Sequence, residues 1–281
     1  MTEENLVVVV TGASRGLGRG IARAFGSLGA IVYMTARTGQ EALAETTREV
    51  SARGGTAIPV TCDHRDDTQV AALFARVGKE QGRLDILVNN AAAVYPDALR
   101  ATGGFWEKPL RLVDMIDVGL RSNYVASYYA APLMIAARRG LIASISFYGA
   151  VSYFHGPAYG AAKAGTDKMT FDMAVDLRPH GVSAVSIWPG FIRTETVAAI
   201  PDDQIPAELA QLWPLFEWPE FTGLVIEALY SDPGLATLSG QALIGAELGV
   251  RYGIVDLDGK QPTSFRQTMG SPARPFEAIQ S

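Results

Sequence analysis

The chain has 281 residues, of which 48% are hydrophobic, and its formal net charge at neutral pH is −5. This acidic balance argues against a nucleic-acid partner, which favours basic surfaces, and no apolar run reaches the about 18 residues of a membrane span. The single cysteine, Cys62, cannot form an internal disulfide, and with three scattered histidines it makes no recognisable metal cluster. The start "MTEENLVVVV" carries acids where a signal peptide would carry lysines, so we expect a cytoplasmic protein without metal or membrane attachment.

Short apolar or β-branched runs alternate with helical patterns along the whole chain. Strands are expected at residues 6–10, 30–36, 57–62, 84–90, 141–146, 182–188 and 241–245. Runs that are apolar on both faces and separated by helices are typical of a parallel sheet covered on both sides. The sequence therefore predicts an α/β fold, with a doubly wound and mostly seven-stranded parallel sheet of the Rossmann type.

The domain organisation is expected to be simple, because no repeat, low-complexity tract or linker divides the chain. Residues 1–250 are predicted to form one Rossmann-fold dinucleotide-binding and catalytic domain. Residues 251–281 are rich in turn formers and are predicted to be a short irregular C-terminal extension of that same domain.

A glycine-rich turn, "TGASRGLG", follows the first predicted strand directly and precedes a helical pattern. Glycines let the backbone turn tightly and approach a ligand, and a helix start offers free N–H groups and a positive dipole end. The position between strand and helix favours a pyrophosphate site over an ordinary turn. The expected contacts in this turn are Gly12, Ser14, Arg15, Gly16, Leu17 and Gly18.

The end of the second strand bears on the choice of cofactor. A site for NAD usually places an acidic residue there for the ribose hydroxyls, but this chain has "MTARTGQ" without one. Arg37, together with Arg15, would supply cations to a 2′-phosphate, so NADP(H) is favoured over NAD(H). The alternative is that both arginines are ordinary surface residues. Asp63, after the third strand, is positioned to accept from the adenine amino group or to serve only as a turn residue.

A tyrosine and a lysine, Tyr159 and Lys163, lie one helical turn apart among small residues. This spacing alone is not specific. Its position matters more, since the pair opens a helix after the fifth strand, on the carboxyl side of the sheet where open α/β folds bind ligands. Ser146 lies thirteen residues upstream at the end of that strand, and Asn123 lies within a preceding helical pattern.

These motifs together carry a family resemblance. "TGASRGLG", "NNA" at 89–91, Ser146, Tyr159 with Lys163, and "PGFIRT" at 189–194 resemble the short-chain dehydrogenase/reductase family. Their order and spacing match its single-domain subgroup over about residues 5–248. The stretches "GRLDILVNNA", "FWEKP" and "HGVSAVSIWPG" further resemble its branch of dehydrogenase/reductase family member 1-like proteins.

The resemblance implies roles for the catalytic residues. Tyr159 would be the general acid or base, Ser146 would hydrogen-bond the carbonyl oxygen, and Asn123 would anchor a water linked to Lys163. A free phenol titrates near ~10, and the Lys163 ammonium with an oxidised nicotinamide would lower that pKa by stabilising the phenolate. The cofactor contacts implied beyond the glycine turn are Asn89, Ala91, Tyr159, Lys163, Pro189, Gly190, Ile192 and Thr194.

The expected activity is hydride transfer between NADP(H) and a carbonyl or alcohol substrate. Aromatic residues near the predicted site favour a bulky apolar ketone, aldehyde or secondary alcohol, unless they pack on one another or on a partner subunit. These aromatic residues are Tyr95, Phe105, Trp106, Tyr148, Tyr153, Phe154, Trp213, Phe216 and Trp218.

Other functions remain open at this point. The alternatives are a catalytically silent NADP(H)-sensing regulatory protein and an NAD-linked alcohol dehydrogenase of the same family. The resemblance also implies a homodimer or homotetramer. One departure from the family pattern, Phe147 in place of a second serine, is predicted not to affect catalysis.

Overall fold

The sheet contains seven parallel strands. The computed structural model describes residues 5–38, 40–95, 97–98, 101–273 and 276–277. The strand order is β3-β2-β1-β4-β5-β6-β7, and every pairing is parallel, which confirms the predicted doubly wound α/β fold. The strands are β1 (Val7–Val10), β2 (Ile31–Ala36), β3 (Thr56–Thr61), β4 (Ile86–Asn89), β5 (Gly140–Ile145), β6 (Val182–Trp188) and β7 (Ala242–Ile244).

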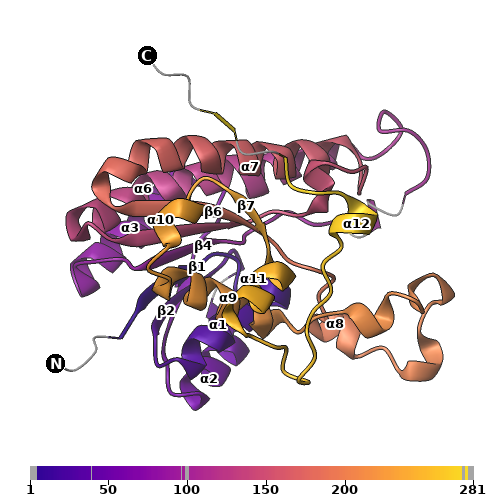
Figure 1. Ribbon diagram of the computed structural model, residues 1–281, viewed down its shortest axis with the longest axis horizontal. Coiled ribbons are helices and arrows are strands. Elements are labelled where there is room, and N and C mark those ends of the chain that lie inside the picture. The colour runs from indigo at the N-terminus through magenta and orange to yellow at the C-terminus, as the bar shows by residue number, and fades with distance from the viewer. Residues whose placement is uncertain (1–4, 39, 96, 99–100, 274–275, 278–281) are drawn as a thin grey trace.

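Helices cover both faces of this sheet, as Figure 1 shows. The alternation within β1 explains why: Val8 and Val10 belong to one apolar cluster, and Val7 and Val9 belong to the other. The first face is covered by α1 (Gly16–Ser27), α2 (Ala44–Ala52), α9 (Pro219–Ser231) and α11 (Gly245–Tyr252). The second face is covered by α3 (Asp67–Gln81), α6 (Ser122–Ala137) and α7 (Pro157–Leu177).

Shorter helices occur mainly in the connections. They are α5 (Asp114–Ile116), α8 (Glu195–Ala198), α10 (Leu235–Leu238) and α12 (Arg266–Met269). Among the helices of the described ranges, none has both the length and the apolar character that crossing a bilayer requires.

The strand order reverses between β1 and β4. In open parallel sheets, ligands bind at the carboxyl ends of the strands where the order reverses. The glycine-rich turn follows β1 at this point, and the segment after β4 lies next to it. The fold thus brings residues 11–18 and 89–92 together at the edge where the sequence predicts a dinucleotide.

The C-terminal extension packs on the domain although it is mostly irregular. Phe265 is buried, and its backbone N–H donates to the hydroxyl of Tyr148 at 3.0 Å. Phe276 stacks against Phe171 of α7, with ring centroids 5.5 Å apart. The segment around α12 therefore contributes Phe265 to the apolar cluster that also holds Trp188 of β6 and Ile244 of β7.

Candidate active site

The glycine-rich turn is fastened to the end of β4. The Thr11 hydroxyl oxygen accepts from the backbone N–H groups of Asn90 and Ala91, both at 2.9 Å. The Asn90 side-chain amide donates to the carbonyl oxygens of Thr11 at 2.8 Å and Gly12 at 3.1 Å. A Cβ on Gly12 would lie 2.9 Å from the Cα of Ala91, and φ there is +67°, so both space and conformation require glycine.

A second brace reaches the turn from β2. The backbone N–H of Gly12 donates to the hydroxyl of Thr35 at 3.0 Å, and that hydroxyl lies 2.8 Å from Nε2 of His64. Burial lowers the pKa of His64 to about 4, so the ring is neutral and its Nε2 can accept the Thr35 proton. The sequence did not single out Thr35, His64 or Asn90 as supports of the turn, although Asn90 lies within the quoted "NNA".

The start of α1 accepts a negative group. The backbone N–H of Gly16 donates to both carboxylate oxygens of Glu195, at 3.0 and 2.9 Å. Thr194 lies over the same turn, since its methyl carbon is 3.5 Å from where a Gly16 Cβ would be. A Cβ on Gly18 would lie 2.4 Å from the Gly12 carbonyl oxygen. The tight turn and its anion-binding amide fit a pyrophosphate.

The remaining predicted contacts around this turn lie at the same edge of the sheet. Arg15 is exposed just before α1, and Arg37 is exposed just after β2, which is the neighbour of β1. Ser14 is half-buried, and Leu17 packs against the core. Asp63 follows β3, and its carboxylate accepts from the Arg65 backbone N–H at 3.0 Å, which makes it a turn residue whatever else it contacts.

Tyr159 and Lys163 share one face of α7, with the Lys163 Nζ 5.5 Å from the Tyr159 ring centroid. Nζ also donates to the Ile145 carbonyl at the end of β5, at 3.0 Å. The Tyr159 ring lies against Gly149, where a Cβ would be 2.5 Å from its Cε1 atom. His155 contacts the same ring edge-on, with centroids 5.2 Å apart. The fold thus brings the carboxyl end of β5 next to the Tyr159 phenol and the Lys163 ammonium.

Burial sets the pKa values of this pair. It lowers the pKa of Lys163 to about 8, against the opposing charge of Asp167. It raises the pKa of Tyr159 above its ordinary value. Without the cofactor, desolvation of the phenolate thus acts against the expected lowering of the Tyr159 pKa by Lys163 and an oxidised nicotinamide, which stays a prediction for the complex.

Ser146 lies directly after β5, where it is 1% exposed. Its hydroxyl donates to the Lys163 carbonyl oxygen at 3.1 Å. The side chain therefore touches the helix that carries Tyr159 and Lys163, but in this conformation its proton is directed at the backbone of α7.

Asn123 lies after a kink at the start of α6. The kink is at Val118 and Gly119, whose dihedral angles leave the helical region, with φ of 145° at Gly119. The Asn123 side-chain amide donates to the Gly119 carbonyl at 2.7 Å, and the backbone carbonyl oxygen of Asn123 accepts from the Asn89 side-chain amide at 3.4 Å. The Asn89 amide also donates to the Ser127 hydroxyl at 3.0 Å. Asn89 is 1% exposed, so its side chain supports the floor of the site and does not line it.

The segment after β6 folds back over the glycine turn. Pro189 and Gly190 are buried, and a Cβ on Gly190 would lie 2.8 Å from the carboxyl of Glu217. Ile192 forms an isolated bridge with Glu217, and Thr194 caps α8 by accepting from the Val197 N–H at 3.4 Å. Burial raises the pKa of Glu217 to about 8, so this carboxyl is largely neutral at pH 7.

Aromatic rings form a continuous cluster beside Tyr159. Phe147 lies 5.2 Å from Phe154 and 6.0 Å from Phe191, and Phe191 lies 5.7 Å from Phe216, as measured between centroids. Phe154 in turn lies 5.9 Å from Tyr159. Phe147 is therefore a buried member of the aromatic cluster beside Tyr159, which its place in the sequence did not indicate.

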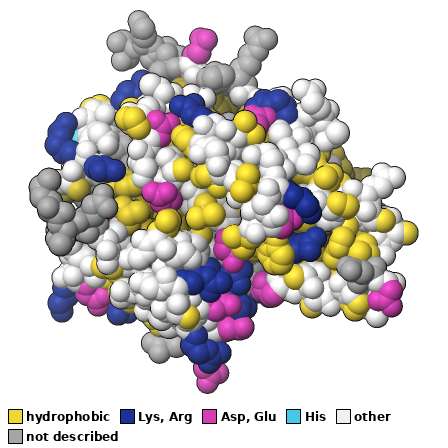
Figure 2. Space-filling view, turned by 60° about the horizontal axis from the view of Figure 1, so that its bottom comes forward, with side chains coloured by type: hydrophobic (Ala, Val, Ile, Leu, Met, Phe, Trp, Pro, Cys, Tyr) yellow, Lys and Arg dark blue, Asp and Glu magenta, His cyan; other side chains and the backbone are white. Residues whose placement is uncertain are grey.

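The aromatic residues that the sequence places near the site partly pack on one another, which is one of the alternatives that the sequence leaves open. Trp213 lies 5.6 Å from Phe216, and Phe265 from the C-terminal extension lies 5.1 Å from Phe191. Trp106 and Tyr153, by contrast, are 75% and 85% exposed. Figure 2 shows hydrophobic side chains gathered on the right of the molecule, the side on which Figure 1 places α8.

Comparisons with known proteins agree with this geometry. Residues 6–205 match the family model described as short chain dehydrogenase. Dehydrogenase/reductase SDR family member 1 of Mus musculus is 42% identical over 263 residues, covering 90% of this chain and 84% of the mouse protein. The predicted resemblance to that branch is thus confirmed.

Two solved structures extend the comparison to cofactor complexes. A metagenomic short-chain oxidoreductase in complex with NADP is 35% identical, with a TM-score of 0.64, and the match covers 81% of this chain and 91% of that one. A variant of actinorhodin polyketide ketoreductase with NADPH is 27% identical, with a TM-score of 0.73, and covers 86% and 96%. From the glycine turn, the Tyr159–Lys163 pair and these matches, we conclude that the chain belongs to the short-chain dehydrogenase family of oxidoreductases.

Proposed function

We propose that the protein is an NADP(H)-dependent oxidoreductase that interconverts a bulky apolar ketone or aldehyde and the corresponding alcohol. The observation that carries this proposal is the placement of Tyr159 and Lys163 on one face of α7, beside Ser146. They lie at the carboxyl edge of the sheet where the glycine turn already accepts an anion. A panel of carbonyl compounds, assayed by the consumption of NADPH with NADH in parallel, tests it.

The residues of the chain divide the reaction between them. A reduced nicotinamide bound at this edge would supply the hydride for the carbonyl carbon. Tyr159 donates its phenolic proton to the carbonyl oxygen, and its raised pKa keeps that proton in place until then. Lys163 returns a proton to the phenolate and recovers its own from solvent. Ser146 turns its hydroxyl from the Lys163 carbonyl toward the substrate oxygen, and Asn123 holds the water that reaches Lys163.

The preference for NADP(H) rests on the cations at the edge of the sheet. Arg37→Ala is expected to raise the KM for NADPH by about 10- to 100-fold, because it removes one charge-assisted hydrogen bond to the 2′-phosphate. The KM for NADH is expected to stay nearly unchanged. Steady-state kinetics with both cofactors measure this. Arg53→Ala, which removes an exposed arginine after α2, is the control. Equal use of NADH by the unmodified protein would contradict the assignment of Arg15 and Arg37.

The contact between Glu195 and Gly16 predicts an effect on cofactor affinity. A bound pyrophosphate would replace the Glu195 carboxylate at the amide of Gly16, because both need the same donor. Glu195→Gln is therefore expected to tighten NADPH binding about 3- to 10-fold, since the displaced group no longer carries a charge. Titration of protein fluorescence measures the dissociation constant, and Asp176→Asn, an exposed position on α7, is the control. Unchanged affinity of the Gln variant would show that Glu195 does not compete.

The proposed substrate class follows from the aromatic cluster. Phe154 and Phe191 continue the aromatic cluster from Tyr159 toward Phe216, and apolar side chains beside the reacting groups favour a bulky hydrophobic substrate. The alternative of a catalytically silent NADP(H) sensor is less well supported, because Ser146, Tyr159 and Lys163 are all present and adjacent.

Self-association is also part of this proposal. Exposed aromatic and aliphatic side chains lie on the two helices next to the site: Tyr124 is 54% and Tyr128 is 64% exposed on α6, and Val175 is 37% exposed on α7. Such side chains support a homodimer or homotetramer through these helices. The molar mass in solution, measured by light scattering, tests it.

A further inference from the structure

A buried carboxylate lies one helical turn beyond Lys163. Asp167 is four residues further along α7, so the two side chains share one side of that helix. Asp167 is only 7% exposed. Because an isolated buried charge is costly, its position calls for partners that compensate it.

Two residues of β6 hold the Asp167 side chain. The Ser186 hydroxyl donates to Oδ1 at 2.5 Å, and the indole Nε1–H of Trp188 donates to Oδ1 and Oδ2 at 3.2 and 3.1 Å. An indole N–H can only donate, so both carboxyl oxygens accept hydrogen bonds from β6. Trp188 is fully buried, which fixes the direction of its N–H.

The charge of Asp167 acts on Lys163 of the proposed catalytic set. It opposes the lowering of the Lys163 pKa by burial. Burial raises the pKa of Asp167 itself, and the hydrogen bonds from Ser186 and Trp188, together with the Lys163 charge, counteract this. The Ser146 hydroxyl donates to the backbone carbonyl oxygen of Lys163, so Ser146 lies against the same stretch of α7.

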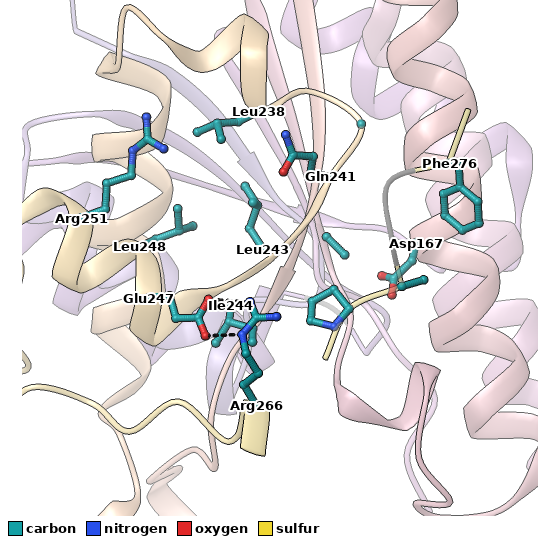
Figure 3. A pocket seen from close by; sticks show the side chains of 14 residues that line it. Asp167, Leu238, Gln241, Leu243, Ile244, Glu247, Leu248, Arg251, Arg266 and Phe276 are labelled. Carbon is teal, nitrogen blue, oxygen red and sulfur yellow. Dashed lines mark hydrogen bonds and ion pairs between the residues drawn. The ribbon is translucent and has the colours of Figure 1, made fainter. Parts of the chain in front are cut away.

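The other side of Asp167 faces a cavity of about 380 Å³ beside β7 and α11. Figure 3 shows Asp167 projecting from α7 into this cavity, with Glu247 and Arg266 paired across it. Those two form a bidentate ion pair with distances of 2.8 and 2.6 Å, and Arg251 pairs with Asp232 at 3.1 Å. The charged groups across the cavity thus compensate one another, whereas Lys163 lies one helical turn from Asp167 on α7.

We propose that Asp167 is a positioning residue for the reaction: its buried carboxylate, one helical turn from Lys163, keeps that side chain in the protonated form that serves Tyr159. This inference rests on the proposed function for its consequence, but the one-turn spacing of the two residues on α7 is present without cofactor or substrate. Without the carboxylate, burial alone would act on Lys163, which would then lose its proton at a lower pH.

The first experiment measures Lys163 directly. The chain has only five lysines, so the side-chain resonances of labelled lysine can be assigned and titrated by NMR without any substrate. Asp167→Asn is expected to move the Lys163 titration downward by about one pH unit or more. Asp172→Asn removes an exposed carboxylate of the same helix, paired with Lys168, and is expected to leave it unchanged. An unchanged Lys163 titration in the Asp167 variant would overturn the proposal.

The second experiment measures the pH profile of turnover. The basic limb of kcat/KM is expected to shift downward in Asp167→Asn, with the effect in kcat and little change in the KM for NADPH. In Asp167→Ala the vacated space adjoins the cavity, so added formate is expected to restore part of the profile, and chloride at equal ionic strength is not. A profile identical to that of the unmodified protein, or equal rescue by chloride, would contradict the role of the charge.

A third variant guards against loss of folding. Ser186→Ala keeps the carboxylate and removes one of its donors, so a smaller downward shift of the Lys163 titration is expected. An unchanged Lys163 titration in Ser186→Ala would count against the proposal, and so would an unchanged titration in an Asp167→Asn variant that is folded. If the unmodified protein reduces no carbonyl compound, the proposed function fails, while the NMR titration still decides the role of Asp167.

Discussion

Replacing Tyr159 by phenylalanine is expected to lower kcat by about 10²- to 10⁴-fold, the usual contribution of a general acid. The hydroxyl is the only group of Tyr159 that the change removes, so the ring contacts with Phe154 and His155 remain. Stability and cofactor binding should therefore be almost unaffected. Loss of kcat with an unchanged dissociation constant for NADPH is the expected pattern, measured by steady-state kinetics and fluorescence titration.

The control for this experiment lies on α6. Tyr128 is 64% exposed, so Tyr128→Phe removes a hydroxyl of the same chemistry outside the aromatic cluster. It should keep the activity of the unmodified protein. A Tyr159→Phe variant that turns over at the normal rate would show that another group protonates the substrate.

Removing the ammonium of Lys163 is expected to have the second largest effect. Lys163→Met keeps an unbranched apolar side chain of similar length but deletes the charge and the hydrogen bond to the Ile145 carbonyl. We expect kcat to fall by about 10²-fold or more, because proton return to the Tyr159 phenolate and cofactor placement both use this group. Lys168→Met, an exposed position on the same helix, is the matched control.

The pH dependence of the unmodified protein follows from the same residue. The pKa of Lys163 is lowered to about 8, so the ammonium is present below that pH and is lost as the pH rises through it. Activity should accordingly decline on the alkaline side of about pH 8, and this limb should be missing from the residual activity of Lys163→Met. A variant with the same alkaline limb as the unmodified protein would assign that limb to another group.

Much of the architecture could be predicted from local patterns. Each of the seven expected strands overlaps an observed one, because runs such as "VVVV" in β1 are apolar on both faces and fit only between two layers of helices. The glycine turn was identifiable because positive φ at Gly12 and Gly16 and close approach at Gly18 exclude most other residues. Strand hydrophobicity and turn conformation are short-range constraints, so a few neighbouring residues are enough to reveal them.

The surroundings of the site depended on contacts between distant segments. Phe265 reaches Phe191 from a position 74 residues further along the chain, and Glu195 reaches Gly16 across 179 residues. No local sequence pattern predicts a contact between residues so far apart in the chain. For the same reason the predicted ligand contact Asn89 has its side chain directed into the core, toward Ser127 and Ser144.

The sequence by itself determined the order of the strands along the chain, the glycine turn and the spacing of Tyr159 and Lys163, since backbone sterics and side-chain periodicity act over neighbouring residues. Only the tertiary structure decided that the pKa of Tyr159 is raised and that Asp167 lies against Ser186 and Trp188. Desolvation and Coulomb interactions depend on everything packed around a group, and that surrounding exists only when the sheet, α7 and the C-terminal extension have assembled.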